Sequence, residues 1–474
     1  MTNSGMKLRI FEIRIDFAFE IRTLHSHIHH SHIRHFICSY LRANNPMKIN
    51  FPILFLLITL FLPGEWVSGQ ETKSITGRVV DQTTQTSLPF AQISMLKSST
   101  GIITNGDGYF ELSVSSFTPY DSAVVYSFGY VPVRIRLGDW ATGGRLIQLT
   151  PAVFKLKEVE VLGMTVEDVL RHTVMAIPDS YGKDPLLLTA FVRVRKMVSN
   201  RLAEYTEAVV RDSKDGYYLY PKKKLTDKHN QSNFSELVKG RVISDTILVN
   251  SLGDVGKNAF CMSCLFSKDL VEFYSGTILD EKEFRFYDYH MEEMQDTTGK
   301  KIYHITFDQK EKVKESLWRG DIYINASDFA IEKIILKPSM KGFNRYNDKT
   351  KYNRMFTIRN KPGWLEEMPL GQTTLTYSIR QGTWYQNTIR NEYWMTYVHP
   401  PTGQHLKYGY LDELVVTDVT RNPDSLRNFK GNRNIAPNQR WDQMIGKEDM
   451  DFWKNYNYLP IEESLKEEIR SLGH

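Results

Sequence analysis

The chain has 474 residues, enough for two or three domains, and its formal net charge is only +5. No basic stripe coincides with a nucleic-acid-reading motif, so the sequence argues against nucleic-acid binding. Aromatic residues make up 12% of the chain, a content that suits β-rich proteins whose sheets present aromatic faces.

An apolar segment at 51–62 follows Lys48 and precedes the small residues at 67–69. A charged start, a short apolar core and a small-residue exit are the features of a secretory signal peptide. The core is too short to cross a membrane comfortably. We therefore predict a signal peptide over 47–69, a mature chain that begins at Gln70 without a transmembrane helix, and a location in the periplasm or at the outer-membrane periphery.

Residues 1–46 carry six histidines between His25 and His35, a composition that can bind metal. A signal peptide acts at the start of a chain. We therefore interpret 1–46 as an over-extended N-terminus, with translation starting at Met47.

The segment 71–150 alternates short β-rich runs with Gly, Asp and Asn turns about every eight to twelve residues, the rhythm of a small β-sandwich. Asn105-Gly106-Asp107-Gly108 predicts a hairpin turn, because glycine tolerates positive φ. The runs are Gly77–Asp81, Leu88–Ala91, Gly101–Phe110 and Tyr126–Tyr130. In order and spacing they resemble the carboxypeptidase-regulatory-like domain of Bacteroidetes envelope proteins. The resemblance implies an Ig- or transthyretin-like sandwich that acts as an accessory module.

A connector and a helix are expected over 151–184. Residues 156–163 resemble the segment that joins such a sandwich to the plug of TonB-dependent receptors, although a helix follows here instead. Thr165, with Asp168 three residues on, predicts the start of that helix, and Pro178 predicts its end.

From 185 to 430 apolar and polar residues alternate with period two, as in Ala190, Val192 and Val194, which predicts half-buried antiparallel strands. The hairpin that begins at Gly320 resembles the strand-turn-strand unit of periplasmic LolA/LolB-like half-barrels. We expect a large curved, half-barrel-like antiparallel sheet, followed by a helical tail over 431–474. The stripe of Ile461, Leu465, Ile469 and Leu472 predicts that the terminal helix covers an edge or a face of that sheet.

The layout from about 156 to the C-terminus resembles an uncharacterised Bacteroidetes family that carries the regulatory-like domain at its N-terminus. The matching residues are Leu188–Arg193, Glu204–Val209, the Gly320 hairpin and the Phe452–Pro460 tail. The family often has Phe-Tyr-Arg-Glu where this chain has Phe191-Val192-Arg193-Val194, without the acid. The chain is thus expected to be mainly β, with a sandwich and a large sheet that have independent cores, and with flanking helices.

Cys261 and Cys264 are the cysteines of the predicted mature chain. Their spacing fits a redox motif or a zinc knuckle, but no second cysteine pair and no βαβ pattern accompanies them. We expect a local disulfide or two buried thiols, because an oxidising compartment favours disulfides.

Zinc hydrolysis of the metallocarboxypeptidase kind requires a His-x-x-Glu pair and a distant histidine. His290 and Glu293 satisfy the short pattern, and His399 or His405 offers a third ligand. A four-residue pattern is common by chance, and the surrounding residues predict strands. We expect no catalytic site, metal or cofactor, and keep a periplasmic hydrolase with an unrecognised site as the alternative.

Three short sequences resemble the Asp-Ser/Thr-apolar site of periplasmic O-glycosylation in this bacterial group. They predict modification at Ser122, Thr246 and Ser425.

The function expected is therefore non-catalytic binding in the cell envelope, with a lipid, a glycan or an envelope protein as the partner. Large aromatic side chains on the predicted sheet give contact area at low entropic cost. Those considered for this role are Tyr323, Phe329, Tyr377, Trp384 and Trp394.

N-terminal sequencing of the protein from an envelope fraction should begin near Gln70, because the segment 47–69 has the features of a cleaved signal peptide. A cytoplasmic protein that begins at Met1 would contradict export and would make the histidine-rich segment part of the protein.

Overall fold

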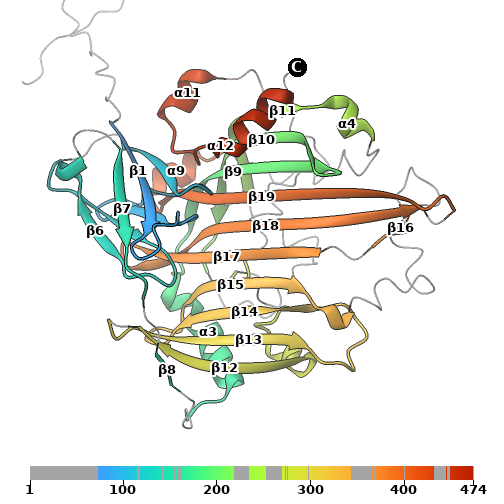
Figure 1. The fold of residues 1–474 in the computed structure, drawn as a ribbon. Helices are drawn as coiled ribbons and strands as arrows, with labels where there is room; N and C mark the ends of the chain where they lie inside the picture. The colour runs from blue at the N-terminus through green and yellow to red at the C-terminus, as the bar shows by residue number, and fades with distance from the viewer. Residues whose placement is uncertain are drawn as a thin grey trace, which may run out of the picture. The chain divides into compact units, whose positions relative to one another are not determined.

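The structure is a computed structural model that describes residues 73–114, 118–140, 144–152, 155–157, 163–217, 234–251, 269–272, 274, 276–296, 298–342, 365–367, 370–399, 401–431, 445 and 449–472. The predicted N-terminal extension at 1–46 and the signal peptide at 47–69 lie outside these residues. Figure 1 shows the fold.

The predicted mainly-β fold class is confirmed, beginning with two small sheets in the orders β4-β1-β7 and β3-β2-β5-β6. The strands are β1 (Lys73–Asp81), β2 (Gln92–Met95), β3 (Gly101–Ile103), β4 (Tyr109–Val114), β5 (Ser122–Tyr126), β6 (Val133–Arg136) and β7 (Arg145–Leu149). The predicted turn before β4 is confirmed: the Asn105 side chain accepts hydrogen bonds from the backbone N–H groups of Asp107 and Tyr109. Gly108 has a φ of 79°, a conformation that favours glycine.

The large sheet is antiparallel, with twelve strands among the described residues in the order β11-β10-β9-β19-β18-β17-β15-β14-β13-β12-β8, and with β16 paired to β18. Its strands are β8 (Lys155–Lys157), β9 (Leu186–Val198), β10 (Arg201–Lys214), β11 (Phe234–Ser244), β12 (Tyr287–Gln295), β13 (Lys301–Gln309), β14 (Trp318–Asn325), β15 (Ile331–Pro338), β16 (Leu365–Glu366), β17 (Leu370–Arg380), β18 (Thr383–His399) and β19 (Gln404–Thr420). Part of the expected connector thus forms the edge strand β8, which pairs with β12.

The helices are short apart from α3. They are α3 (Val166–Ser180), α4 (Thr246–Ser251), α9 (Pro423–Asn428), α11 (Met450–Asn455) and α12 (Glu463–Leu472), with 3-10 helices η1 (Leu137–Trp140) and η2 (Glu281–Phe286). The capping box of Thr165 and Asp168 is present at the start of α3. The predicted end at Pro178 is wrong by two residues, because the N–H of Tyr181 donates to the carbonyl of Ile177 and both residues are buried.

The two faces of the large sheet pack against different elements, because successive residues of a strand face opposite sides. Val192 and Val194 of β9 join the core that includes α3, whereas Phe191 joins the core of the sandwich. That second core also contains Trp453 and Leu459 of the C-terminal tail. The prediction of independent cores is therefore wrong: the sandwich buries part of its apolar surface against the sheet.

The terminal helix lies where its apolar stripe predicts. Leu465 of α12 packs on Leu202 and Tyr205 of β10, with Ile461, Ile469 and Leu472 partly buried around them. The helix also contacts β11, so it covers the sheet near one edge. Such cover protects strand edges from pairing with other chains.

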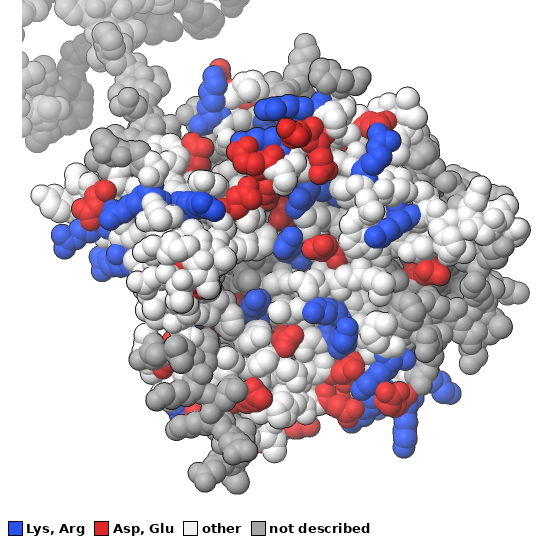
Figure 2. All heavy atoms as spheres, viewed as in Figure 1, with Lys and Arg blue, Asp and Glu red and all other residues white. Residues whose placement is uncertain are grey.

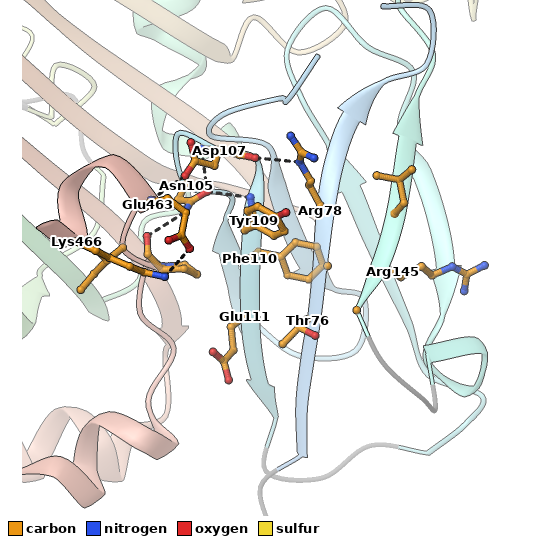
Figure 3. Close-up of a pocket in the computed structure, with 15 residues that line it drawn as sticks. Thr76, Arg78, Asn105, Asp107, Tyr109, Phe110, Glu111, Arg145, Glu463 and Lys466 are labelled. Carbon is orange, nitrogen blue, oxygen red and sulfur yellow. Dashed lines mark hydrogen bonds and ion pairs between the residues drawn. The ribbon is translucent and has the colours of Figure 1, made fainter. Parts of the chain in front are cut away.

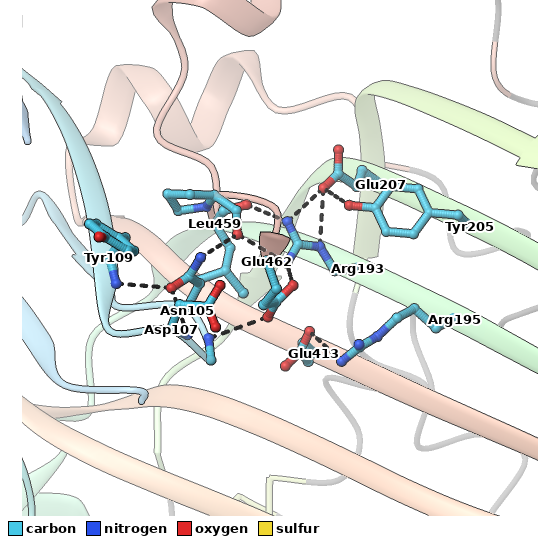
Figure 4. Close-up of polar contacts among 12 residues, drawn as sticks. Asn105, Asp107, Tyr109, Arg193, Arg195, Tyr205, Glu207, Glu413, Leu459 and Glu462 are labelled. Atoms are coloured by element: carbon cyan, nitrogen blue, oxygen red, sulfur yellow. Dashed lines mark hydrogen bonds and ion pairs between the residues drawn. The ribbon is translucent and has the colours of Figure 1, made fainter. Parts of the chain in front are cut away.

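A fully buried guanidinium, that of Arg193 in β9, joins the sheet to the tail (Figure 4). It donates to Glu207 of β10 at 2.8 and 3.1 Å and to the backbone carbonyl of Leu459, and it lies 3.4 Å from the Glu462 carboxylate. Arg241 of β11 donates to the other oxygen of Glu207 at 2.6 Å. Burial acts to raise the pKa of Glu207, but Arg193 and Arg241 outweigh it and hold that pKa below its usual value.

The tail in turn binds the sandwich at the turn before β4. The side-chain amide of Asn105 donates to the Pro460 carbonyl at 3.2 Å, and the N–H of Gly106 donates to Glu462 at 3.3 Å. A second buried arginine, Arg380 of β17, donates to the backbone carbonyl of Ser99 between β2 and β3 at 2.7 Å. These contacts fix the sandwich over the sheet.

The core on the α3 side of the sheet encloses an ionic cluster. Lys214 lies 2.6 Å from Asp269 and 2.9 Å from Glu272. The hydroxyl groups of Tyr217 and Tyr377 donate to Asp269 at 3.0 and 2.8 Å. The neighbouring carboxyl of Asp212 accepts a hydrogen bond from Ser235 at 2.7 Å.

Replacing Arg193 by Met should lower the free energy of unfolding by about 3–5 kcal/mol, because Glu207 and the Leu459 carbonyl would lose a buried partner. Urea denaturation of the mature chain measures this loss. The matched control is Arg171→Gln: Arg171 pairs with Asp168 and Glu281 at 2.8 Å, but its side chain is 43% exposed. That change should lower stability by about 0–1 kcal/mol. Equal losses in the two variants would contradict the role given to Arg193.

The stability of the protein should fall as the pH rises toward 8, partly because of Asp212. Burial raises the pKa of Asp212 to about 8, and Lys214 opposes this only in part. The unfolded carboxyl titrates near its ordinary value of about 3.9. Stability from this group is therefore full below that value and is lost as the pH rises through the folded pKa.

Asp212→Asn cannot ionise and should lose less stability than the unmodified chain between about pH 5 and pH 8. Urea midpoints at the two pH values measure the difference. Parallel losses in the two proteins would show that Asp212 is already ionised at the lower pH.

Candidate functional site

The sheet face that meets the sandwich carries alternating charges on five neighbouring strands. The row, in register from β11 to β18, is Arg241, Glu207, Arg193, Glu413 and Arg390. Directly paired residues share a face, so each side chain in the row lies beside an opposite charge. Positive and negative side chains also interleave on the surface in Figure 2, without a broad region of one sign.

A groove of about 480 Å³ lies between the sandwich and the tail (Figure 3). Its charged groups have partners within the protein. Arg78 donates to Ser87 at 2.7 Å and lies over the ring of Tyr109, and Lys466 of α12 pairs with Glu463 at 2.5 Å. The charged groups that line this groove are therefore already paired within the protein, and we do not choose it as the candidate site.

A second cleft, of about 260 Å³, lies between the sandwich and strands β15, β17, β18 and β19. Its floor holds two registered rows: Lys333, Thr376 and Thr388 form one, and Thr374, Arg390 and Glu413 form the other. Gln372 and Asn387 add amides to the floor, and the sandwich contributes the aromatic residues Phe90, Tyr126 and Phe128.

Glu413 is the unusual group of this cleft. It is only 3% exposed, yet neither of its carboxylate oxygens has a hydrogen-bond partner among the described residues. The nearest cations, Arg195 and Arg390, lie 3.6 Å away. Buried carboxylates are normally hydrogen-bonded, so Glu413 retains accepting capacity, with both of its oxygens buried in the wall of the cleft.

Phe90 lies over Arg390, with the guanidinium 4.5 Å from the ring centroid. Its φ of 60° is left-handed, which is unfavourable for a bulky residue. Thr104 holds this turn: its carbonyl accepts from the N–H of Phe90 at 3.1 Å, and its hydroxyl donates to the carbonyl of Leu88 at 2.6 Å. Backbone strain that the surrounding structure imposes is often found at functional sites.

The aromatic residues considered from the sequence lie mostly elsewhere. Tyr377 and Trp384 are buried in the α3-side core, where Phe329 also packs. Trp394 lies under Lys407, with the ammonium 4.3 Å from its ring. Of the five, Tyr377 is nevertheless among the residues that line the cleft, and Tyr323 contacts a lining residue, Phe128, with 4.6 Å between the two ring centroids.

The zinc alternative fails on strand geometry. His290 and Glu293 are three residues apart on β12, so their side chains face opposite sides of the sheet. Glu293 is 2.9 Å from Lys301, and His399 contacts Thr402 at 2.7 Å. His405 lies on exposed β19 sequence. Within the described ranges, no three His, Cys, Asp or Glu side chains are placed to hold a metal ion.

The remaining predicted sites stay predictions. Cys261 and Cys264 lie outside the described residues. Thr246 is exposed at the start of α4 and Ser425 is half-buried in α9, whereas Ser122 is buried in β5. Of the three expected modification sites, Thr246 is thus the most accessible in the folded chain.

Two parts of the chain match known families. Residues 75–161 match the CarboxypepD_reg-like domain, which confirms the predicted N-terminal module. Residues 261–379 match a family of unknown function, DUF5686, which agrees with the resemblance to an uncharacterised family. No curated protein matches the chain. In the part of the chain that the structure describes, no helix is both long and apolar enough to span a membrane.

Solved structures show only distant likeness. A domain named for outer membrane lipoprotein sorting, from Vibrio parahaemolyticus, is 12% identical with a TM-score of 0.22, covering 55% of this chain and 98% of its own. A DUF1329 family protein from Desulfovibrio piger is 10% identical with a TM-score of 0.22, and the match covers 54% of this chain and 92% of that protein. A membrane-associated protein of unknown function from Bacteroides fragilis is 9% identical with a TM-score of 0.14, and the match covers 73% of this chain and 98% of that protein. At these TM-scores the likenesses carry no argument about function.

Proposed function

We propose that this protein is a non-catalytic binding protein of a Bacteroidetes-type cell envelope, located in the periplasm or at the outer-membrane periphery. The signal-peptide pattern at 47–69 and the match of 75–161 to a CarboxypepD_reg-like domain support this location. Its ligand is a glycan, bound in the cleft between the sandwich and the large sheet.

The observation that carries the proposal is the Glu413 carboxylate, buried in the cleft without a hydrogen-bond partner among the described residues. Both oxygens are themselves buried, so neighbouring sugar hydroxyls would reach their free lone pairs once the side chains around them, Arg195 and Arg390 among them, move aside. Around it, the hydroxyl of Thr374 and the amides of Gln372 and Asn387 offer neutral partners for further hydroxyls. The rings of Phe90 and Phe128 offer apolar surface for the C–H faces of a sugar.

A glycan fits this cleft better than an acyl chain does. An acyl chain would cover the polar floor without hydrogen-bonding to it, and burying unpaired polar groups is unfavourable. The apolar face of the sheet is occupied by α3, where Val169, Leu170 and Ile177 are fully buried in the core.

The cleft also argues against glycoside hydrolysis. Its two buried carboxylates belong to Glu332 on β15 and Glu413 on β19, strands that are three spacings apart, about 14 Å, and the two residues are in different rows along the strands. Paired carboxylates in most glycosidases are about 5–9.5 Å apart. Glu332 is also engaged by Tyr126, Lys300 and Asn325, which leaves it little freedom to act as an acid or a base.

The test is to apply the mature chain, residues 70–474, to an array of bacterial glycans, and to measure the affinity of bound glycans by calorimetry. Phe90→Gly removes a ring from the cleft and relieves the left-handed backbone, so binding should weaken about tenfold without loss of thermal stability. Tyr120→Ala is the matched control, because Tyr120 is 85% exposed on the sandwich and outside the cleft. Binding of peptides or lipid vesicles with no binding of glycans would overturn the proposal.

A further inference from the structure

One cation of the cleft lacks a carboxylate partner. Lys333 of β15 is half-buried, and its ammonium lies 5.2 Å from the ring centroid of Phe128 and 6.0 Å from that of Tyr323. No described carboxylate forms an ion pair with it. Its position in the floor row beside Thr376 places it within the cleft rather than on the open face.

The acids nearest to Lys333 are bound to other groups. Glu332, the preceding residue, pairs with Lys300 at 2.7 Å and accepts from Tyr126 and Asn325 at 3.1 and 3.2 Å. Asp321 lies 3.0 Å from the imidazole of His304. Each carboxylate that might neutralise Lys333 is thus held by a different donor.

The protein groups around Lys333 disfavour its charged form. Burial lowers the pKa of the Lys333 ammonium, and Asp321 opposes this only in part. The rings of Phe128 and Tyr323 attract the ammonium by cation–π interaction, which is weaker than a direct ion pair in a site shielded from water. A negative group on a ligand would supply the missing partner.

The second cation of the floor is placed differently. Arg390 lies two strands from Lys333, about 10 Å away in the direction of strand pairing. It is 3.6 Å from Glu413 and stacks on Phe90. Arg390 thus has a carboxylate close by at its end of the cleft, whereas Lys333 forms no ion pair with a described carboxylate at the other end.

We infer that the ligand of the cleft is an acidic glycan, in which a carboxylate, sulfate or phosphate group pairs with the Lys333 ammonium while neutral hydroxyls meet Glu413. This inference rests on the proposed function. It adds the charge of the ligand and the residue that recognises it.

The experiment compares matched pairs of glycans on the mature chain: oligouronates with their methyl esters, and sulfated galactans with their desulfated forms. The strongest pair is then titrated by calorimetry. The acidic member should bind at least about tenfold more tightly than its neutral form, and added salt should narrow the difference. Lys333→Met should remove the preference, and Lys333→Arg should keep most of it.

Lys312→Met is the control, because Lys312 is an exposed lysine outside the cleft, and it should bind as the unmodified chain does. Thermal unfolding of Lys333→Met should show unchanged or higher stability, since the variant buries no charge. Equal affinity for both members of every pair, or an acidic preference that survives Lys333→Met, would overturn the inference and leave glycan binding standing. Failure to bind any glycan would overturn both.

Discussion

The arrangement of this protein depends on one buried charge, the guanidinium of Arg193. A buried cation is unfavourable unless its donors are matched, and here the partners come from the neighbouring strand through Glu207 and from the tail through Leu459 and Glu462. The tail that supplies them also binds the sandwich turn at Asn105. Sheet, tail and sandwich are therefore held by one network, and the cleft exists because the sandwich is fixed over strands β15–β19.

The two faces of the large sheet serve different purposes. One is mainly apolar and packs against α3, so it contributes to stability as a hydrophobic core does, although it also encloses the ionic cluster around Lys214. The other carries the charge row, with apolar contacts beneath the sandwich at Phe191, Val209 and Val415 and beneath α12 at Tyr205. Because charges alternate from strand to strand, each charged side chain of the row can hydrogen-bond to its neighbour wherever the two come within bonding distance. Between β19 and β18 they do not, and Glu413 is left with unused acceptors.

Local patterns in the sequence predicted most of the helices and strands, apart from the end of α3 and the strand β8, but they did not predict the cleft. Period-two alternation, the capping box at Thr165 and the stripe of α12 depend on residues close in the chain, and each was predicted correctly. The cleft brings Phe90 to Arg390 and Tyr126 to Glu332, pairs whose separation in the chain exceeds any local period. Arg193 shows the same limit. The alternation of apolar and polar residues along its strand predicts a solvent-facing side chain. The side chain is buried instead, because it meets Glu462, which is 269 residues away in the chain.

Phe90 and Lys333 are both locally unfavourable, and they lie at the same cleft. Glycine would relieve the backbone at the first position, and an apolar side chain would avoid the buried charge at the second. Each feature alone is compatible with the imperfect packing of an ordinary protein. Their coincidence around a carboxylate with unused acceptors is harder to attribute to packing, because violations of local rules concentrate where a ligand completes the structure. An acidic glycan would supply a negatively charged partner for Lys333 and hydrogen-bond donors for Glu413. The ring of Phe90 would pack against the same ligand.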